Sequence, residues 1–147
     1  MKRATPYLMF AGNAEEAFAY YHQVFGGEAP EIIRYRDMDT SGRDMGTPDA
    51  DLVAHVSLKI ADETVLMGSD LSGRYLENHV VGTHIEIHLA AHDADEARRV
   101  FAALAEGGTE SMPLAKVAWS ELFGSCVDRY GIRWMVDYAG EVQYGAG

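Results

Sequence analysis

Apolar residues recur at helical spacing in two parts of the chain, one beginning after Asn13 and the other after Asp93. In both parts an apolar residue returns every third or fourth position, which is typical of a helix that buries one face. The residues concerned are Ala14, Ala17, Phe18, Tyr21, Val24 and Phe25 in the first part and Ala97, Val100, Phe101 and Leu104 in the second. We therefore predict two amphipathic helices.

The ends of both predicted helices carry residues that commonly start and stop helices. Asn13 and Asp93 can accept hydrogen bonds from first-turn amides, and a glutamate three residues later can reach back in a capping box. Glycine pairs at 26–27 and 107–108 supply a left-handed stop. Because the two helix starts lie eighty residues apart, the chain is predicted to be an internal repeat.

Short apolar or alternating segments surround each helix and predict strands. One strand precedes each helix, at 7–10 and at 85–89, and three strands follow it. The following strands are expected at about 32–36, 52–60 and 64–69 in the first copy and at 114–119, 122–128 and 132–138 in the second. Tight hairpin turns are expected at 61–63 and 128–131. The predicted order is thus βαβββ, twice.

This order predicts the α+β fold class and one domain over residues 1–147. Module one is expected at about 4–70, a linker at about 71–83 and module two at about 84–140. The stretch 37–51, rich in Asp, Gly, Ser and Thr, is expected to form a mobile loop.

Strand parity predicts which side chains point away from the helices, since successive side chains alternate between the two faces of a sheet. The helix-facing rows are Ala54, Val56, Leu58 and Ile60, then Ile85, Ile87 and Leu89, and finally Ile132, Trp134, Val136 and Tyr138. The opposite faces are therefore expected to carry His55, Ser57, His84, Glu86, His88, Arg133, Met135 and Asp137.

Charge and cysteine content narrow the classes of partner. A formal net charge of -11 and a pI near 4.8 disfavour nucleic acid and anionic lipid as partners. No apolar run approaches the roughly 20 residues that a membrane helix needs, and the N-terminus lacks a signal-peptide pattern, so a cytoplasmic location is expected.

The single cysteine, Cys126, excludes an internal disulfide and is expected to be a buried apolar residue rather than a nucleophile.

Four stretches of the sequence resemble a known family. They are Pro6 to Ala14, Ala54-His55-Val56, Val65 to Asp70, and Trp119 through Phe123-Gly124 to Met135. With the tandem βαβββ order, they resemble the vicinal-oxygen-chelate (glyoxalase/bleomycin-resistance/dioxygenase) superfamily, and within it the PhnB-like branch labelled demethylubiquinone methyltransferase-like. The resemblance implies curled mixed sheets around a concave cavity. The glycine-rich loop of a Rossmann-type methyltransferase is absent from the sequence.

Metal enzymes of that superfamily place one ligand on each of the first, fourth, fifth and eighth strands. Alignment by the helix caps and the last turn assigns these four places to Pro6, Met67, Glu86 and Met135. Only Glu86 has a side chain suited to Zn²⁺, Ni²⁺, Fe²⁺ or Mn²⁺, because a thioether is a poor ligand for these ions. The resemblance therefore implies a protein without the usual catalytic metal and without another cofactor.

A relocated metal site is the alternative. His84, Glu86 and His88 alternate along one predicted strand face, with His55 as a further donor. Alternate residues are about 6.6 Å apart, so two of them plus a donor from another strand could bind one ion. The competing interpretation is that these are hydrogen-bonded polar residues of a cavity or interface.

Three more residues are candidates by resemblance to the same branch. Trp119 and Phe123 are expected either to line an apolar ligand pocket or to lie in the core. Asp70 is interpreted as a turn-capping carboxylate in preference to a catalytic base.

Three functions remain open at this point. The preferred one is binding of a small apolar or aromatic molecule on the concave sheet face, with candidate contacts His55, Met67, His84, Glu86, His88, Trp119, Phe123, Met135 and Asp137. The second is a divalent-metal-dependent lyase, isomerase or dioxygenase that uses the relocated site. The third is an assembly or regulatory protein with no ligand. A homodimer is expected, because open sheet faces and edges tend to be covered.

Overall fold

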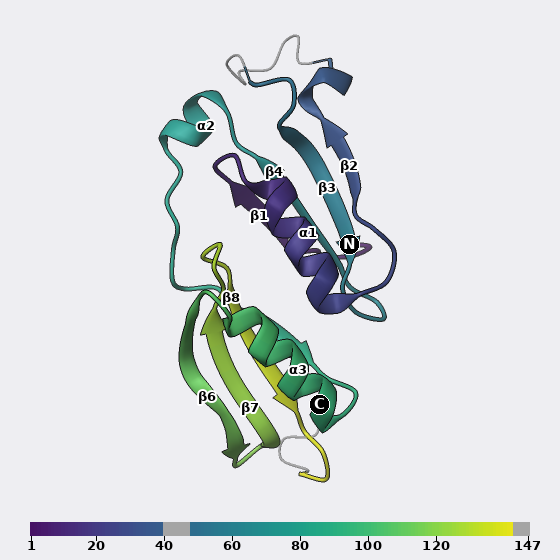
Figure 1. The fold of residues 1–147 in the computed structure, drawn as a ribbon, viewed down its shortest axis with the longest axis vertical. Coiled ribbons are helices and arrows are strands. Elements are labelled where there is room, and N and C mark those ends of the chain that lie inside the picture. Colours follow the sequence, from purple (N-terminus) through teal and green to yellow (C-terminus); the bar gives the residue numbers. More distant parts are fainter. Residues whose placement is uncertain (40–47, 143–147) are drawn as a thin grey trace. The chain divides into compact units, whose positions relative to one another are not determined.

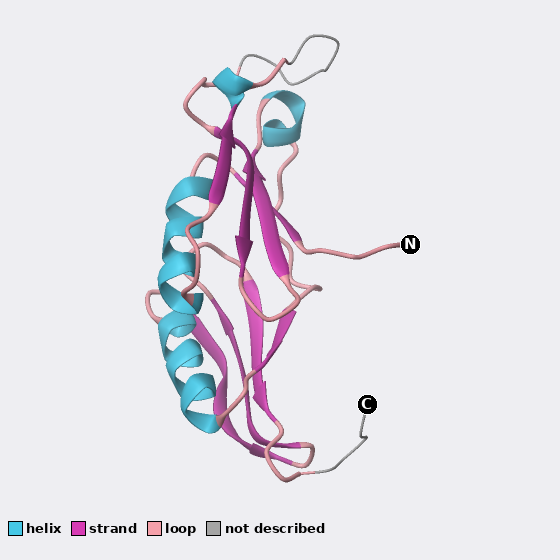
Figure 2. Cartoon of the chain, turned by 90° about the vertical axis from the view of Figure 1, so that its right-hand side faces the viewer, coloured by secondary structure: helices cyan, strands magenta, loops and turns pink. Residues whose placement is uncertain are grey.

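The computed structural model describes residues 1–39 and 48–142 and divides into two compact units, Met1–Val80 and Val81–Gly147. Each unit contains one four-stranded mixed sheet and one long helix that packs against a face of that sheet (Figures 1 and 2). The predicted βαβββ repeat and the α+β class are confirmed. Among the described residues, the model contains no helix long and apolar enough to span a bilayer.

The first unit has the sheet order β1-β4-β3-β2, in which β1 runs parallel to β4 and the other pairs are antiparallel. Its elements are β1 (Tyr7–Phe10), α1 (Ala14–Phe25), β2 (Glu31–Arg34), a 3-10 turn (Tyr35–Asp37), β3 (Val53–Lys59), β4 (Val65–Asp70) and α2 (Gly73–Glu77). The part of the predicted loop at 40–47 lies outside the described residues.

The second unit repeats this topology with the order β5-β8-β7-β6. Its elements are β5 (Ile87–Ala90), α3 (Ala94–Ala105), β6 (Thr109–Val117), β7 (Ser120–Val127) and β8 (Arg133–Tyr138). The parallel pair is β5 with β8. The equivalent strands of the two units are therefore β1 and β5, β4 and β8, β3 and β7, and β2 and β6.

The two long helices form where the apolar spacing predicted them. Every apolar position predicted for their buried faces is buried except Phe25, which is partly exposed. Gly26, Gly27 and Gly107 have positive φ, as a glycine stop requires. Asp93 caps α3 by accepting a hydrogen bond from the Glu96 amide at 2.8 Å, as predicted.

The predicted cap of α1 is wrong. The Asn13 side chain makes no capping hydrogen bond. The acceptor is Asp70, at the end of β4, whose Oδ1 accepts from the amides of Ala14 at 2.9 Å and Gly12 at 3.1 Å. Its Oδ2 accepts from the Val53 amide at 2.9 Å, and the residue is only 1% exposed. Asp70 is thus a structural capping carboxylate that joins α1, β3 and β4.

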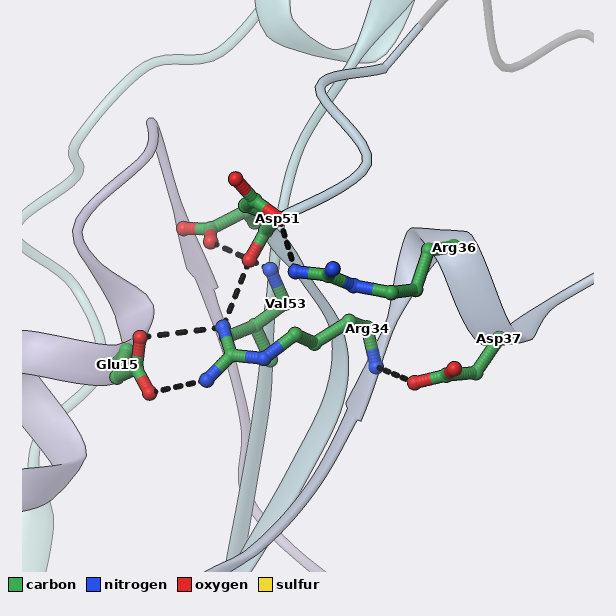
Figure 3. A network of polar contacts seen from close by, with 7 residues as sticks. Glu15, Arg34, Arg36, Asp37, Asp51 and Val53 are labelled. Atoms are coloured by element: carbon green, nitrogen blue, oxygen red, sulfur yellow. Dashed lines mark hydrogen bonds and ion pairs between the residues drawn. The ribbon is translucent and has the colours of Figure 1, made fainter.

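Further contacts hold the same corner of the first unit (Figure 3). The Arg34 guanidinium binds both carboxylate oxygens of Glu15, at 3.1 and 2.5 Å, and donates to the Asp51 carbonyl at 2.7 Å. Arg36 pairs with the Asp51 carboxylate. The hydrogen bonds from Arg34 hold the pKa of Glu15 below its ordinary value. These contacts fix β2 and the start of β3 to the first turn of α1.

The second unit has its own buried aspartate at the β7–β8 hairpin. Asp128 accepts from the backbone amides of Tyr130 at 2.8 Å and Ile132 at 3.1 Å, and from Trp134 Nε1 at 2.8 Å. Trp134 is fully buried and Asp128 is 3% exposed. The carboxylate therefore closes the hairpin and satisfies the indole of the largest core side chain.

Strand ends differ from the predicted ones in the second unit. β6 begins at Thr109 rather than 114, because its polar first half is held by pairing with β7 rather than by an apolar row. β5 begins at Ile87, so His84 lies outside it in a bend. Trp119 lies in the turn between β6 and β7.

The strand registers also show which positions of the two units are equivalent. Ser57 pairs with Met67 and Ser125 with Met135, so Met67 and Met135 are equivalent, as the sequence alignment assigned. The cross-strand pair adjacent to each of these points toward the helix. It is Val56 with Gly68 in the first unit and Gly124 with Val136 in the second. A Cβ on Gly68 would lie 2.8 Å from the Phe18 ring, so the close packing of that ring requires glycine there.

Candidate functional site

Each sheet has a face that points away from its long helix, and these two faces hold most of the candidate residues. Face A, in the first unit, comprises Tyr7, Met9, Ile33, His55, Ser57, Met67 and Ser69, as assigned from strand register. Face B, in the second unit, comprises His88, Ala90, Phe123, Ser125, Arg133, Met135 and Asp137. Tyr7, Met9 and Ile33 are exposed although they are large and apolar.

A tyrosine–histidine pair lies on face A. Tyr7 OH is 3.0 Å from His55 Nδ1, and the two rings are tilted with centroids 5.6 Å apart. Tyr7 belongs to β1 and His55 to β3, and the pair reaches across β4, where the small side chain of Ser69 leaves room. Met67 lies beside Tyr7 in the register of β1 and β4. Face A therefore combines one polar pair with thioether and aromatic surface.

A chain of three polar side chains lies at face B. Asp137 Oδ2 is 3.0 Å from His88 Nε2, and Asp137 Oδ1 accepts a hydrogen bond from the Ser120 hydroxyl. Ser120 is 1% exposed, the Asp137 side chain 17% and the His88 side chain 50%. Exposure thus increases from the serine to the histidine, so the histidine is the member that solvent or a ligand can reach.

Aromatic and thioether surface surrounds this polar chain. Phe123 is the cross-strand neighbour of Asp137, and Met135 is the neighbour of His88. The Trp119 ring packs edge-on against Phe123 with centroids 5.3 Å apart and is itself 43% exposed. Phe123 is only 7% exposed and belongs to the core, so Trp119 is the member of this pair that solvent can reach at this end of face B.

The three residues of the relocated metal site are not brought together. Glu86 lies 3.7 Å from Arg133 in an ion pair, His88 contacts Asp137, and His84 lies outside β5. In the described ranges, no three His, Cys, Asp or Glu side chains are arranged so that they could hold a metal ion. The structure therefore assembles no set of ligands at these residues.

The structural register changes one assignment made from the sequence. Tyr7 lies beside Met67 and His88 beside Met135, so His88 is the equivalent of Tyr7. The sequence alignment assigns these two places to Pro6 and Glu86 instead. The spacing of eighty residues holds for the two helix starts, but the equivalent strand residues Tyr7 and His88 are 81 residues apart. The fifth-strand place beside Met135 therefore belongs to His88.

Sequence reasoning missed Tyr7 and Ser120. The alternation of side chains along β1 predicts the position of Tyr7. Leu8 and the buried Phe10 lie on one face of the strand, so Tyr7 lies on the other. Ser120 had no such signal, since its role depends on Asp137, a residue from another strand.

Cys126 is buried on the helix side of β7. Burial, followed by the nearby carboxylates of Asp128, Glu110 and Glu86, raises its pKa to about 11. The thiol is therefore protonated near neutral pH, which confirms the prediction that it is a buried apolar residue rather than a nucleophile.

Comparison with known proteins gives one consistent family. Residues 2–137 match the model of the family described as 3-demethylubiquinone-9 3-methyltransferase. Protein YjdN of Escherichia coli K12 is 30% identical over 142 residues, covering 90% of this chain and 92% of that protein.

Solved structures agree with this match. Protein PA1353 from Pseudomonas aeruginosa is 34% identical, with a TM-score of 0.77 over 94% of this chain and 98% of that one. The PhnB protein from Bacillus cereus is 26% identical, with a TM-score of 0.71 over 94% and 100%. A glyoxylase/bleomycin resistance protein/dioxygenase domain from Frankia is 8% identical, with a TM-score of 0.61 over 95% and 98%, a likeness of fold alone.

Proposed function

The chain belongs to the PhnB-like 3-demethylubiquinone-9 3-methyltransferase family, which has the glyoxalase/bleomycin-resistance fold, and from that premise we propose that it binds a small apolar or aromatic molecule without the usual catalytic metal. The binding surface in this proposal is the side of each sheet that faces away from its helix, faces A and B. Methyl transfer is not part of the proposal, because Ala11-Gly12-Asn13-Ala14 follows the first strand in place of a glycine-rich nucleotide loop.

The observation that carries the proposal is the equivalence of Met67 and Met135. Both occupy the face away from the helix, and each lies beside the first strand of its own sheet. A thioether is flexible and polarisable, so it adapts to apolar and aromatic ligands, whereas it binds Zn²⁺, Ni²⁺ or Mn²⁺ poorly. The exposed Tyr7, Met9 and Trp119 extend this apolar surface.

Binding of the neutral dye Nile red tests the proposal. The wild-type protein is expected to raise the dye's fluorescence, and Met67→Glu and Met135→Glu should each weaken this binding at least fivefold, because each places a charge in the apolar surface. Val80→Glu is the matched control, since Val80 is an 83% exposed apolar residue outside both sheets. Equal binding by all four proteins, or none by the wild type, would refute the proposal.

We also propose that the protein forms a homodimer. Open sheet edges and exposed apolar side chains such as Ile33 and Met112 favour burial against a second copy. Light scattering coupled to size-exclusion chromatography should give twice the chain mass of 16.1 kDa. A mass of one chain at all concentrations tested would contradict this.

A further inference from the structure

Resting on the proposed function, we infer that face B binds a hydroxyarene, a flat aromatic molecule with a phenolic hydroxyl, and that His88 Nδ1 accepts the hydrogen bond from that hydroxyl. The inference names the ligand class for one of the two faces. It depends on the orientation of His88, on its surroundings and on its exposure.

The partner of His88 fixes which ring nitrogen carries the proton. Asp137 Oδ2 lies 3.0 Å from Nε2. A carboxylate only accepts hydrogen bonds, so Nε2 must be the donor. In the neutral imidazole the other nitrogen, Nδ1, then has a free lone pair. His88 therefore offers an acceptor to a ligand rather than a donor.

Asp137 is held in place in its turn. Its Oδ1 accepts from the hydroxyl of Ser120, which is buried at 1% exposure in the first position of β7. The two carboxylate oxygens thus have separate donors, one from a rigid strand and one from the ligand-binding ring. Ser120 and Asp137 are positioning residues in this arrangement, and of the three polar residues only His88 touches the ligand.

The surroundings of His88 favour an aromatic ligand over a polar one. Met135 is its cross-strand neighbour, and the Trp119–Phe123 pair lies on the far side of Asp137. Of the pair, Phe123 is buried at 7% exposure and Trp119 is 43% exposed, so the reachable groups are the Trp119 ring and the Met135 thioether, which favour flat rings through edge-to-face and sulfur–aromatic contacts. Arg133, the cation of face B, forms an ion pair with Glu86 at 3.7 Å.

Face A does not offer the same acceptor. The position equivalent to His88 is Tyr7, the one equivalent to Asp137 is Ser69, and the one equivalent to Phe123 is His55. The histidine of face A therefore contacts a phenol of the protein itself. On face B the histidine contacts a carboxylate, and the phenolic partner is the ligand that we infer.

The test compares two probes that differ in one hydrogen-bond donor, 2-naphthol and its methyl ether, 2-methoxynaphthalene. Binding is measured by equilibrium dialysis at about pH 8, above the pH at which imidazole ordinarily takes up a proton. The wild type is expected to bind 2-naphthol about five- to tenfold more tightly than the ether, the usual effect of one hydrogen bond. In His88→Phe this ratio should fall to about one, while the ether still binds.

Asp137→Ala tests the positioning role by the same ratio. Loss of the carboxylate frees the ring to turn and to exchange its proton between nitrogens, so the preference for 2-naphthol should fall at least threefold. A general disturbance of the sheet would weaken both probes equally and leave the ratio unchanged. His92→Phe is the matched control, because His92 also contacts a carboxylate, Glu96, but at the start of α3.

The outcomes separate the inference from the proposed function. If the wild type binds both probes equally, or if His88→Phe keeps the preference, the inference is wrong although the binding function stands. If neither probe binds to the wild type although Nile red does, the inference is wrong and the proposed function stands; if Nile red does not bind either, both fail.

Discussion

The two units have the same topology, yet the buried aspartates among their described residues, Asp70 and Asp128, lie at opposite ends of equivalent strands. In the first unit Asp70 lies at the end of β4, where it caps α1. In the second, Asp128 lies at the hairpin between β7 and β8. The position equivalent to Asp70 is Tyr138, and the one equivalent to Asp128 is Ile60, as the matching hairpin hydrogen bonds show.

The difference follows from how each helix is capped. α3 has its own cap in Asp93, so the second unit needs no acceptor from the sheet at that point. α1 has no side-chain cap from Asn13, and its first amides would otherwise remain unpaired beside a buried corner. A local cap at the start of one helix thus determines whether the sheet must supply a buried charge there.

The largest effect is expected from Asp70→Ala. The substitution leaves the amides of Gly12, Ala14 and Val53 without their acceptor and should lower the free energy of unfolding by about 3–5 kcal/mol. Urea denaturation followed by circular dichroism measures this. The control is Asp95→Ala, because the Asp95 side chain on α3 is fully exposed. This variant should leave the urea midpoint unchanged within error.

The Asp70 variant also tests whether the units open independently. Cys126 is buried in the second unit and reacts with a disulfide reagent only when that unit opens. If Asp70→Ala destabilises the first unit alone, the rate of Cys126 labelling in native buffer should stay at the wild-type value. A large acceleration would show that the two units unfold together.

Asp128→Ala is expected to cost about 2–4 kcal/mol, slightly less than Asp70→Ala, because one of its three donors is a side chain. It should accelerate Cys126 labelling. Combining it with Trp134→Phe also removes the indole N–H that donates to Asp128, so the double variant should be more stable than the sum of the two single effects predicts. Additive effects in this cycle would show that the Asp128–Trp134 contact contributes little.

A smaller effect separates the two helix starts. Asp93→Ala should lower the free energy of unfolding by about 1 kcal/mol, the usual loss for a helix cap. Asn13→Ala should leave it nearly unchanged, because the Asn13 side chain caps nothing. Urea midpoints of the two variants provide the measurement, and equal losses would mean that Asn13 caps α1 in solution.

The smallest effect concerns Glu15 and pH (Figure 3). Because its hydrogen bonds from Arg34 lower its pKa in the folded state, its contribution to stability is present above the ordinary value of 4.5. It is lost as the pH falls through the folded pKa. The urea midpoint of Glu15→Gln should therefore lie below that of the wild type at neutral pH and approach it in acid. Glu16→Gln, without the Arg34 contact, should show a weaker change with pH.

Local sequence patterns predicted the parts of the fold that depend on local contacts. The two long helices and the hairpins at 61–63 and 128–131 follow from apolar spacing and turn residues, and the structure confirms them, whereas the short α2 was not predicted and lies in the expected linker. The α1 cap was not predictable in this way, since Asp70 is 56 residues from the Ala14 amide that it binds. β6 was expected too short because an edge strand can be polar and even contain Pro113.

The candidate site was predicted in composition more than in arrangement. Parity assigned His55, His88, Met135 and Asp137 to the faces away from the helices, and the strand registers agree. Which of them contact each other depends on register between strands, and the observed register moves the place beside Met135 by two residues, from Glu86 to His88. Ligand binding, the absence of the usual catalytic metal and the homodimer remain predictions.

The glycine–valine pairs of the two units have a consequence for how such a repeat can diverge. In one half the valine is at 56 and the glycine at 68, while in the other the glycine is at 124 and the valine at 136. Gly68 cannot gain a side chain while Phe18 and the Leu8 backbone hold their places, since the added carbon would lie 2.8 Å from the ring and 2.9 Å from the Leu8 carbonyl oxygen. If both halves descend from one ancestral copy, the order of mutations was constrained: a change at position 18, together with a shift of the β1 backbone at Leu8, had to precede or accompany any enlargement at 68. Sequences of relatives should therefore show these two positions varying together.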